Sequence, residues 1–194
     1  MNHHIESEIL WSSIRNPVCR QCSLHKGVKT VCCIGDGPVP AEGMIVGEAP
    51  GGDEDKNGIP FSGKAGTFLR QQLEEIGLDP KTLFITNVVK CHPPKNKTPK
   101  RTEANACSSL YLPKEIAAVK PKVILLLGGT AISWAKGAKS AVGKLEGSTF
   151  KLGDGTVCVP SRHPSAVLRG NRGPFKENLL LFRDALKQAG ANRQ

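Results

Sequence analysis

The chain has 194 residues, a formal net charge of +10 at pH 7 and a hydrophobic content of 39%. This length suits one domain over residues 1–194 with a buried core of two or three layers, and no apolar run approaches the ~20 residues that span a membrane. The N-terminus also lacks the basic and apolar regions of a signal peptide, so we expect a cytoplasmic protein with no membrane partner.

The charge is unevenly distributed along the chain. Residues 1–80 carry 7 Lys or Arg against 11 Asp or Glu, whereas residues 81–194 carry 20 against 6. A basic half of this size suggests a polyanionic partner, most simply nucleic acid. Charge alone is equally compatible with the solvated surface of a protein from a salty or hot habitat.

The predicted elements alternate between strands and helices. A short amphipathic helix is predicted over residues 5–15, and a segment rich in Cys, Gly and Pro follows at about 17–42. Apolar runs typical of buried strands occur at 43–48, 83–89, 122–128 and within 156–164. Helical patterns occur at 64–77, 102–119 with Thr102 as the cap, 129–137 and 174–189. This order predicts the α/β class, with a three-layer α/β/α sandwich around a mainly parallel four-stranded sheet.

Ligands of such folds bind outside the carboxyl ends of the strands. Four segments follow the predicted strands and should converge there: GEAPG (47–51), TNVVKC (86–91), LGGTA (127–131) and SRHPSAVLR (161–169). The first resembles a phosphate-binding turn, but such turns avoid carboxylates and this one contains Glu48. We expect the acidic residues 53–55 to face solvent or to brace the loop.

Seven cysteines without an export signal are unlike a disulfide framework and favour metal or cluster ligation. The set Cys19, Cys22, Cys91 and Cys107 pairs a C-x2-C motif with two distant thiols, which suits either zinc or an iron–sulfur cluster. Such a site would tie the N-terminal segment to the core, and unrelated buried thiols are the alternative. Cys158 is expected in the core, while residues 32–33 could compete for a metal.

Three motifs accompany this cysteine set: GEAPGGDEDKNGIPFSGKAG (47–66), ITNVVKC (85–91) and HPSAVLR (163–169). Together they closely resemble the family 4 uracil-DNA glycosylases, the iron–sulfur branch of that superfamily, over about residues 17–189. The resemblance implies a monofunctional DNA repair enzyme that hydrolyses the N-glycosidic bond of a flipped-out uracil and leaves an abasic site. It also implies a [4Fe-4S] cluster, with zinc as the alternative.

The resemblance implies a role for each motif. Glu48 and His163 would be catalytic: Glu48 would act on water or on the sugar cation, and His163 would donate a hydrogen bond to uracil O2. Phe61 would stack on the base, and the Asn87 carboxamide would pair with O4 and N3-H. Gly47, Ala49 and Ser165 complete the expected substrate site.

The expected DNA contacts follow from the same resemblance. Leu168 would enter the minor groove as a wedge beside Arg169, with positive charge supplied by Lys90, Lys97, Lys100 and Arg101. The implied partner is uracil-containing DNA, single- or double-stranded. We expect a monomer, and a sliding clamp is a candidate protein partner.

The chain departs from the family pattern at two positions, with His92 where many members carry Arg and Arg162 where many carry Thr. A related branch traps uracil-DNA covalently through a histidine, but it has Gln in the first motif, where this chain has Ala49. Excision of another deaminated base and covalent uracil capture remain alternatives on the same fold. A non-catalytic DNA-binding iron–sulfur module is the alternative from another class.

Overall fold

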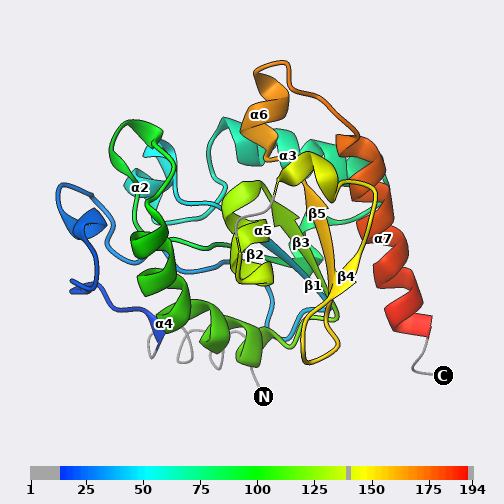
Figure 1. Ribbon diagram of the computed structural model, residues 1–194, viewed down its shortest axis with the longest axis horizontal. Helices are drawn as coiled ribbons and strands as arrows, with labels where there is room; N and C mark the ends of the chain where they lie inside the picture. Colours follow the sequence, from blue (N-terminus) through cyan, green and yellow to red (C-terminus); the bar gives the residue numbers. More distant parts are fainter. Residues whose placement is uncertain (1–13, 139–140, 192–194) are drawn as a thin grey trace.

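A computed structural model describes residues 14–138 and 141–191 (Figure 1). The helix predicted over residues 5–15 lies almost entirely outside this range. Of its residues the structure describes Ile14, which is buried, and Arg15, which is exposed. Within the described residues, no helix is both long and apolar enough to cross a membrane.

A central sheet of five strands forms the core of the fold (Figure 1). Its strands stand in the order β2-β1-β3-β5-β4, with bounds β1 Gly43–Gly47, β2 Leu83–Asn87, β3 Val123–Leu127, β4 Phe150–Lys151 and β5 Val157–Ser161. The first four in this order pair in parallel, and β4 pairs antiparallel with β5. The mainly parallel sheet is confirmed, and the fifth strand is an edge of two residues, too short to leave a period in the sequence.

Helices cover both faces of the sheet and complete the three layers (Figure 1). The α-helices are α2 Gly52–Asn57, α3 Lys64–Glu75, α4 Arg101–Val119, α5 Gly129–Lys136, α6 Pro164–Leu168 and α7 Phe175–Ala191. Four 3-10 turns accompany them: η1 Ser23–His25, η2 Pro80–Thr82, η3 Pro94–Asn96 and η4 Val142–Lys144. The short helices α2 and α6 were not predicted, because each lies within a motif that reads as a loop.

Alternate residues of each parallel strand enter opposite halves of the core. Ile45 and Leu125 pack with the apolar face of α3 and α7, while Met44 and Ile124 pack with α4 and α5. Because both faces are covered, every residue of β1 and β3 is buried. This explains why the strands read as continuous apolar runs.

The cysteine-bearing N-terminal segment is joined to the edge of the sheet by backbone hydrogen bonds. Asp36 and Ile85 exchange two of them, at 2.9 and 2.8 Å, and the Cys33 amide donates to the Lys90 carbonyl at 2.7 Å. The segment therefore covers the edge of β2, which would otherwise present unpaired peptide groups.

The start of α4 differs from the prediction. Lys100, not Thr102, is the N-cap residue, and the Glu103 carboxylate accepts a hydrogen bond from the Lys100 amide at 2.8 Å. An acidic side chain at the third helical position satisfies an orphan amide and suits the positive end of the helix dipole. Thr102 lies exposed within the first turn.

Gly66 provides a test of close packing beneath the candidate site. A Cβ at this position in α3 would lie 2.8 Å from Phe61 Cα and closer still to the Phe61 carbonyl, which is backbone and cannot rotate away. We expect Gly66→Ala to lower the free energy of unfolding by about 1–3 kcal/mol in chemical denaturation. Gly52→Ala is the matched control, since a Cβ there meets nothing within 4 Å. Equal stability of the two variants would contradict this packing.

Candidate active site

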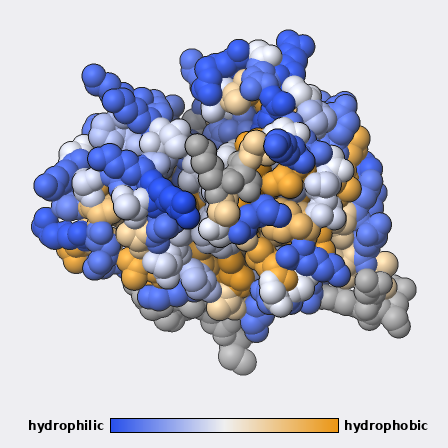
Figure 2. Space-filling model, viewed as in Figure 1, coloured by the Kyte–Doolittle hydropathy of each residue, from blue (hydrophilic) through white to orange (hydrophobic). Residues whose placement is uncertain are grey.

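The segments that follow the parallel strands enclose one cavity of about 500 Å³. The cavity lies between α2 and α6, which stand at the same end of the sheet in Figure 1. The predicted residues that line it are Glu48, Ala49, Phe61, Asn87, Lys97, His163, Ser165, Leu168 and Arg169. Hydrophilic residues cover much of the upper and left parts of the face in Figure 2, and hydrophobic residues gather toward its middle.

Glu48 directly follows β1, the strand at which the topology reverses. From β1 the chain passes to β2 on one side and later to β3 on the other, so the crevice opens between β1 and β3. Thr130, just after β3, donates from Oγ1 to Glu48 Oε2 at 2.6 Å across this opening. Thr130 was not singled out from the sequence, although its segment was; its position after a strand end was the available sign.

Phe61 forms part of the cavity wall in a strained backbone conformation. Its φ of +55° is rare for a bulky residue, and Arg70 donates to its carbonyl. The Phe61 and His163 rings stack with centroids 5.7 Å apart. Gly47 permits this arrangement, because a Cβ there would lie 2.5 Å from Phe61 Cζ.

Asn87 presents a buried amide to the cavity. Its side chain is about 1% exposed, and its Oδ1 atom has no hydrogen-bond partner among the described residues. A buried polar atom left unpaired costs about 1–3 kcal/mol, so such an atom on a cavity wall indicates a polar ligand. Gly47 again provides the room, since a side chain there would collide with Oδ1.

His163 is the N-cap of α6, and its ring is oriented by Ser165. The Ser165 amide donates to Nδ1 at 3.2 Å, and Ser165 Oγ lies 2.8 Å from the same nitrogen. Because Nδ1 accepts the amide hydrogen, the neutral ring carries its proton on Nε2. Burial, with a smaller contribution from the Arg169 charge, lowers the pKa of His163 to about 4. At neutral pH the ring is therefore an uncharged donor through Nε2.

The segment after His163 carries an exposed apolar residue. Leu168 ends α6 and is exposed, and Arg169 follows it. Arg162 braces this segment: its guanidinium donates to both Glu146 carboxylate oxygens, at 2.8 and 3.0 Å, and to Asn171 Oδ1. The loop is thus anchored on both sides of its exposed tip.

Lys90 requires a correction. It was predicted to contact DNA, but its side chain is fully buried and forms a 2.7 Å ion pair with Glu115. A buried ammonium cannot reach a phosphate. Lys100 and Arg101 do lie on the surface, at the start of α4, but outside the lining of the cavity.

Two backbone amides of residues that line the cavity donate to groups within the protein. Ser165 donates to His163, and Gly51 donates to Glu54 at 3.0 Å. Of the acidic residues 53–55, Asp53 is exposed, whereas Glu54 and Asp55 are buried and brace the loop. Asp55, for example, accepts from the amides of residues 29–30 at 3.0 Å.

The four predicted ligand cysteines line a second, small cavity together with Cys32 and Tyr111. Burial raises the pKa of Cys91 to about 11 and that of Cys107 to about 12. Clustered buried thiols of this kind suit a soft metal centre, which would stabilise them as thiolates. Among the described residues, however, no three Cys, His, Asp or Glu side chains converge as ligands of a single ion.

Comparisons with known proteins agree on one family. The sequence model of the uracil DNA glycosylase superfamily matches residues 34–189. A type-4 uracil-DNA glycosylase of Thermotoga maritima is 37% identical over 163 residues, covering 84% of both chains. The enzymes of the same name from Pyrobaculum aerophilum and Sulfurisphaera tokodaii are 40% and 42% identical, covering 84% and 77% of this chain and 87% and 71% of theirs.

The lowered pKa of His163 predicts a specific pH dependence of stability. Above pH 6.5 the histidine is neutral in both the folded and the unfolded chain. As the pH falls from about 6.5 to about 4, only the unfolded chain takes up the proton, so the free energy of unfolding decreases by up to about 3 kcal/mol. Denaturation profiles of the wild type and His163→Asn should diverge over this range, and parallel profiles would contradict the assignment.

Proposed function

The chain belongs to the uracil DNA glycosylase superfamily, and we propose that it excises uracil from DNA by hydrolysing the N-glycosidic bond, leaving an abasic site. Uracil in a duplex is inaccessible until its nucleotide leaves the stack. The cavity at the strand ends is the pocket proposed for the extruded base.

The Asn87 amide is the observation that carries this proposal. Its unpaired Oδ1 can accept the N3-H of uracil while its Nδ2 donates to O4. Cytosine presents the opposite pattern at these two positions and would leave the buried amide unpaired, at a cost of about 1–3 kcal/mol. Phe61 supplies the apolar wall against which the base stacks.

His163 and Glu48 are the residues proposed to assist bond cleavage. As the glycosidic bond breaks, negative charge accumulates on the departing uracil, and Nε2-H of neutral His163 would donate to O2. A donor aimed at developing charge contributes about 3–4 kcal/mol to the transition state. The Glu48 carboxylate, oriented by Thr130, would position the attacking water or stabilise the sugar cation.

DNA would bind across the mouth of this cavity. Exposed Leu168 is proposed to fill the space that the extruded nucleotide leaves, with Arg169 beside it. Lys97, Lys100 and Arg101 would attract the phosphates. His92 does not line the cavity and bonds Asn96 at 2.9 Å, so nothing here favours covalent capture through it.

Excision assays test the proposal directly. Duplexes carrying U, hypoxanthine, xanthine or T should yield alkali-sensitive sites, with uracil preferred. Single-turnover excision of uracil should fall about 100- to 1,000-fold in His163→Gln, with duplex affinity largely retained. Lys64 and Lys97 line the cavity, and a lysine amine can cleave the strand through a Schiff base. Strand breaks before alkali treatment would therefore contradict simple hydrolysis. Activity on none of the duplexes would overturn the enzymatic proposal.

We further propose that Cys19, Cys22, Cys91 and Cys107 hold a [4Fe-4S] cluster. In a cubane each thiolate ligates a different iron, so the four sulfurs need not converge on one point, as zinc would require. When bound, the cluster would serve as a staple between the N-terminal segment, the strand-end loop and α4.

Loss of a ligand should remove the cluster. The purified protein should absorb broadly near ~400 nm with stoichiometric iron, and Cys107→Ala should lose both. Cys158→Ala is the matched control, since Cys158 is also buried but lies on β5 and does not line the cysteine cavity. A colourless wild type with stoichiometric zinc would overturn the assignment.

A further inference from the structure

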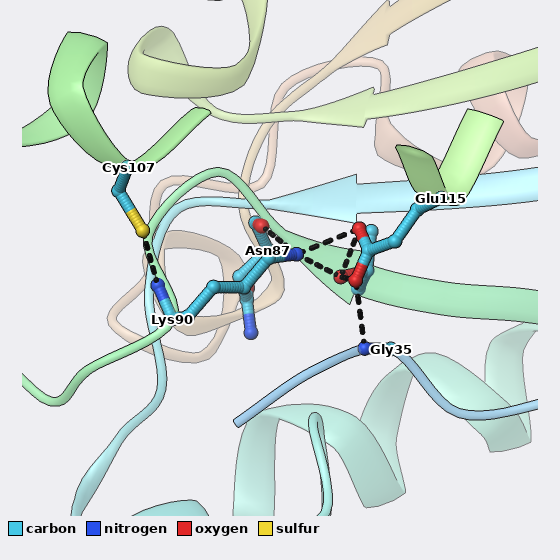
Figure 3. Close-up of polar contacts among 6 residues, drawn as sticks. Gly35, Asn87, Lys90, Cys107 and Glu115 are labelled. Carbon is cyan, nitrogen blue, oxygen red and sulfur yellow. Dashed lines mark hydrogen bonds and ion pairs between the residues drawn. The ribbon is translucent and has the colours of Figure 1, made fainter. Parts of the chain in front are cut away.

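Lys90 is buried between the candidate base pocket and the cysteine site (Figure 3). Its ammonium donates to Thr86 Oγ1 at 2.6 Å, to the Asn87 carbonyl at 2.8 Å and to Glu115 Oε2 at 2.7 Å. An ammonium has three donors, and each has a partner. Its backbone amide donates to Cys107 Sγ at 3.2 Å, and its carbonyl accepts from Cys33. Every polar group of Lys90 thus has a hydrogen-bond partner within the protein.

Glu115 extends this network to the N-terminal segment. Its Oε1 atom accepts from the Gly35 amide at 3.0 Å, and both of its carboxylate oxygens accept from the Thr86 hydroxyl. Figure 3 shows the Glu115 carboxylate, which extends from α4, facing Gly35 on one side and Lys90 on the other. The ion pair therefore joins β2, α4 and the cysteine-bearing segment.

Stability alone does not explain a buried pair of this kind. Removing two charges from water is costly, and apolar replacements of buried ion pairs are often neutral or stabilising. The position of the contact with Asn87 is more informative. The peptide group that follows Asn87 is held at both polar ends, because its carbonyl accepts from Lys90 and its Val88 amide donates to Gly47 O at 3.0 Å. Fixing this peptide fixes the direction of the Asn87 Cα–Cβ bond, from which the carboxamide extends.

We propose that Lys90 is a positioning residue that holds the Asn87 carboxamide toward the base and links it to the cysteine site through Cys107. This inference rests on the proposed excision of uracil. Lys90 does not touch the substrate. It acts through the backbone of Asn87, and Glu115 supplies the counter-charge that allows the ammonium to be buried there.

The double variant Lys90→Met/Glu115→Gln tests this proposal. It removes both charges together, and the glutamine retains an acceptor for Gly35 and Thr86. The wild type, which keeps the ammonium and its contact with Asn87, is the control, because Glu115→Gln alone would leave the buried ammonium without its counter-charge. Thermal unfolding and iron content report on the fold and the cysteine site, while duplex affinity and the single-turnover excision rate of uracil report on function.

We expect the double variant to remain folded, with unchanged iron content and duplex affinity, and to excise uracil at least tenfold more slowly than the wild type. Loss of rate without loss of binding is the mark of positioning. A folded double variant that excises uracil within about twofold of the control would overturn the proposal. Failure of both the double variant and Lys90→Gln/Glu115→Gln to fold would also overturn it, by making the pair purely structural. An inactive wild type would instead count against the proposed function.

Discussion

Strand β1 pairs in parallel with β2 on one side and with β3 on the other, and the candidate site depends on this pairing. The register aligns Gly47 with Asn87, so the first and second motifs leave the sheet at the same level. On the opposite side, the end of β3 brings Thr130 to Glu48. Groups separated by 82 residues in the chain thus meet because three strands end together.

A second constraint is the close approach of backbone to side chains around Gly47. Phe61 and Asn87 occupy the space where a Cβ would stand, so the residues proposed for base stacking and base recognition depend on one glycine. The left-handed backbone at Phe61 costs of order 1–3 kcal/mol, and it is held by Arg70 and by close packing against Gly66 of α3. These contacts hold the cavity wall in one conformation, which would limit the entropy lost on binding of the proposed base.

Prediction from sequence succeeded where the local pattern carries the information. The apolar runs predict β1 to β3 and β5, and their ends place Glu48, Asn87 and His163 at one edge of the sheet. The burial of Lys90 could not be predicted in this way. Its partner Glu115 lies 25 residues away on α4, and no period or motif connects the two positions. A lysine in a basic half of the chain reads as a surface charge until its counter-ion is located.

The short helices show a different limit of sequence reasoning. The α2 helix has six residues, and Gly51 is its N-cap. Six residues are too few to show a hydrophobic period. Glu54 and Asp55 are buried, but acidic residues in such a short segment are typical of a surface loop. They are buried because loop amides, including that of Gly63 at 2.9 Å, donate to them. These long-range bonds are set by tertiary structure.

Arg162, which bonds Glu146 and Asn171, is also in steric contact with position 173. A Cβ at Gly173 would overlap the Arg162 guanidinium group, and Gly173 has a φ of +46°. A substitution at either position therefore changes which residues the other position can accept. With arginine at 162, a side chain at position 173 would have to displace the guanidinium group from Glu146, whereas a smaller residue at 162 would admit asparagine at 173 without this loss. Covariation of these two positions among related sequences would record this steric coupling.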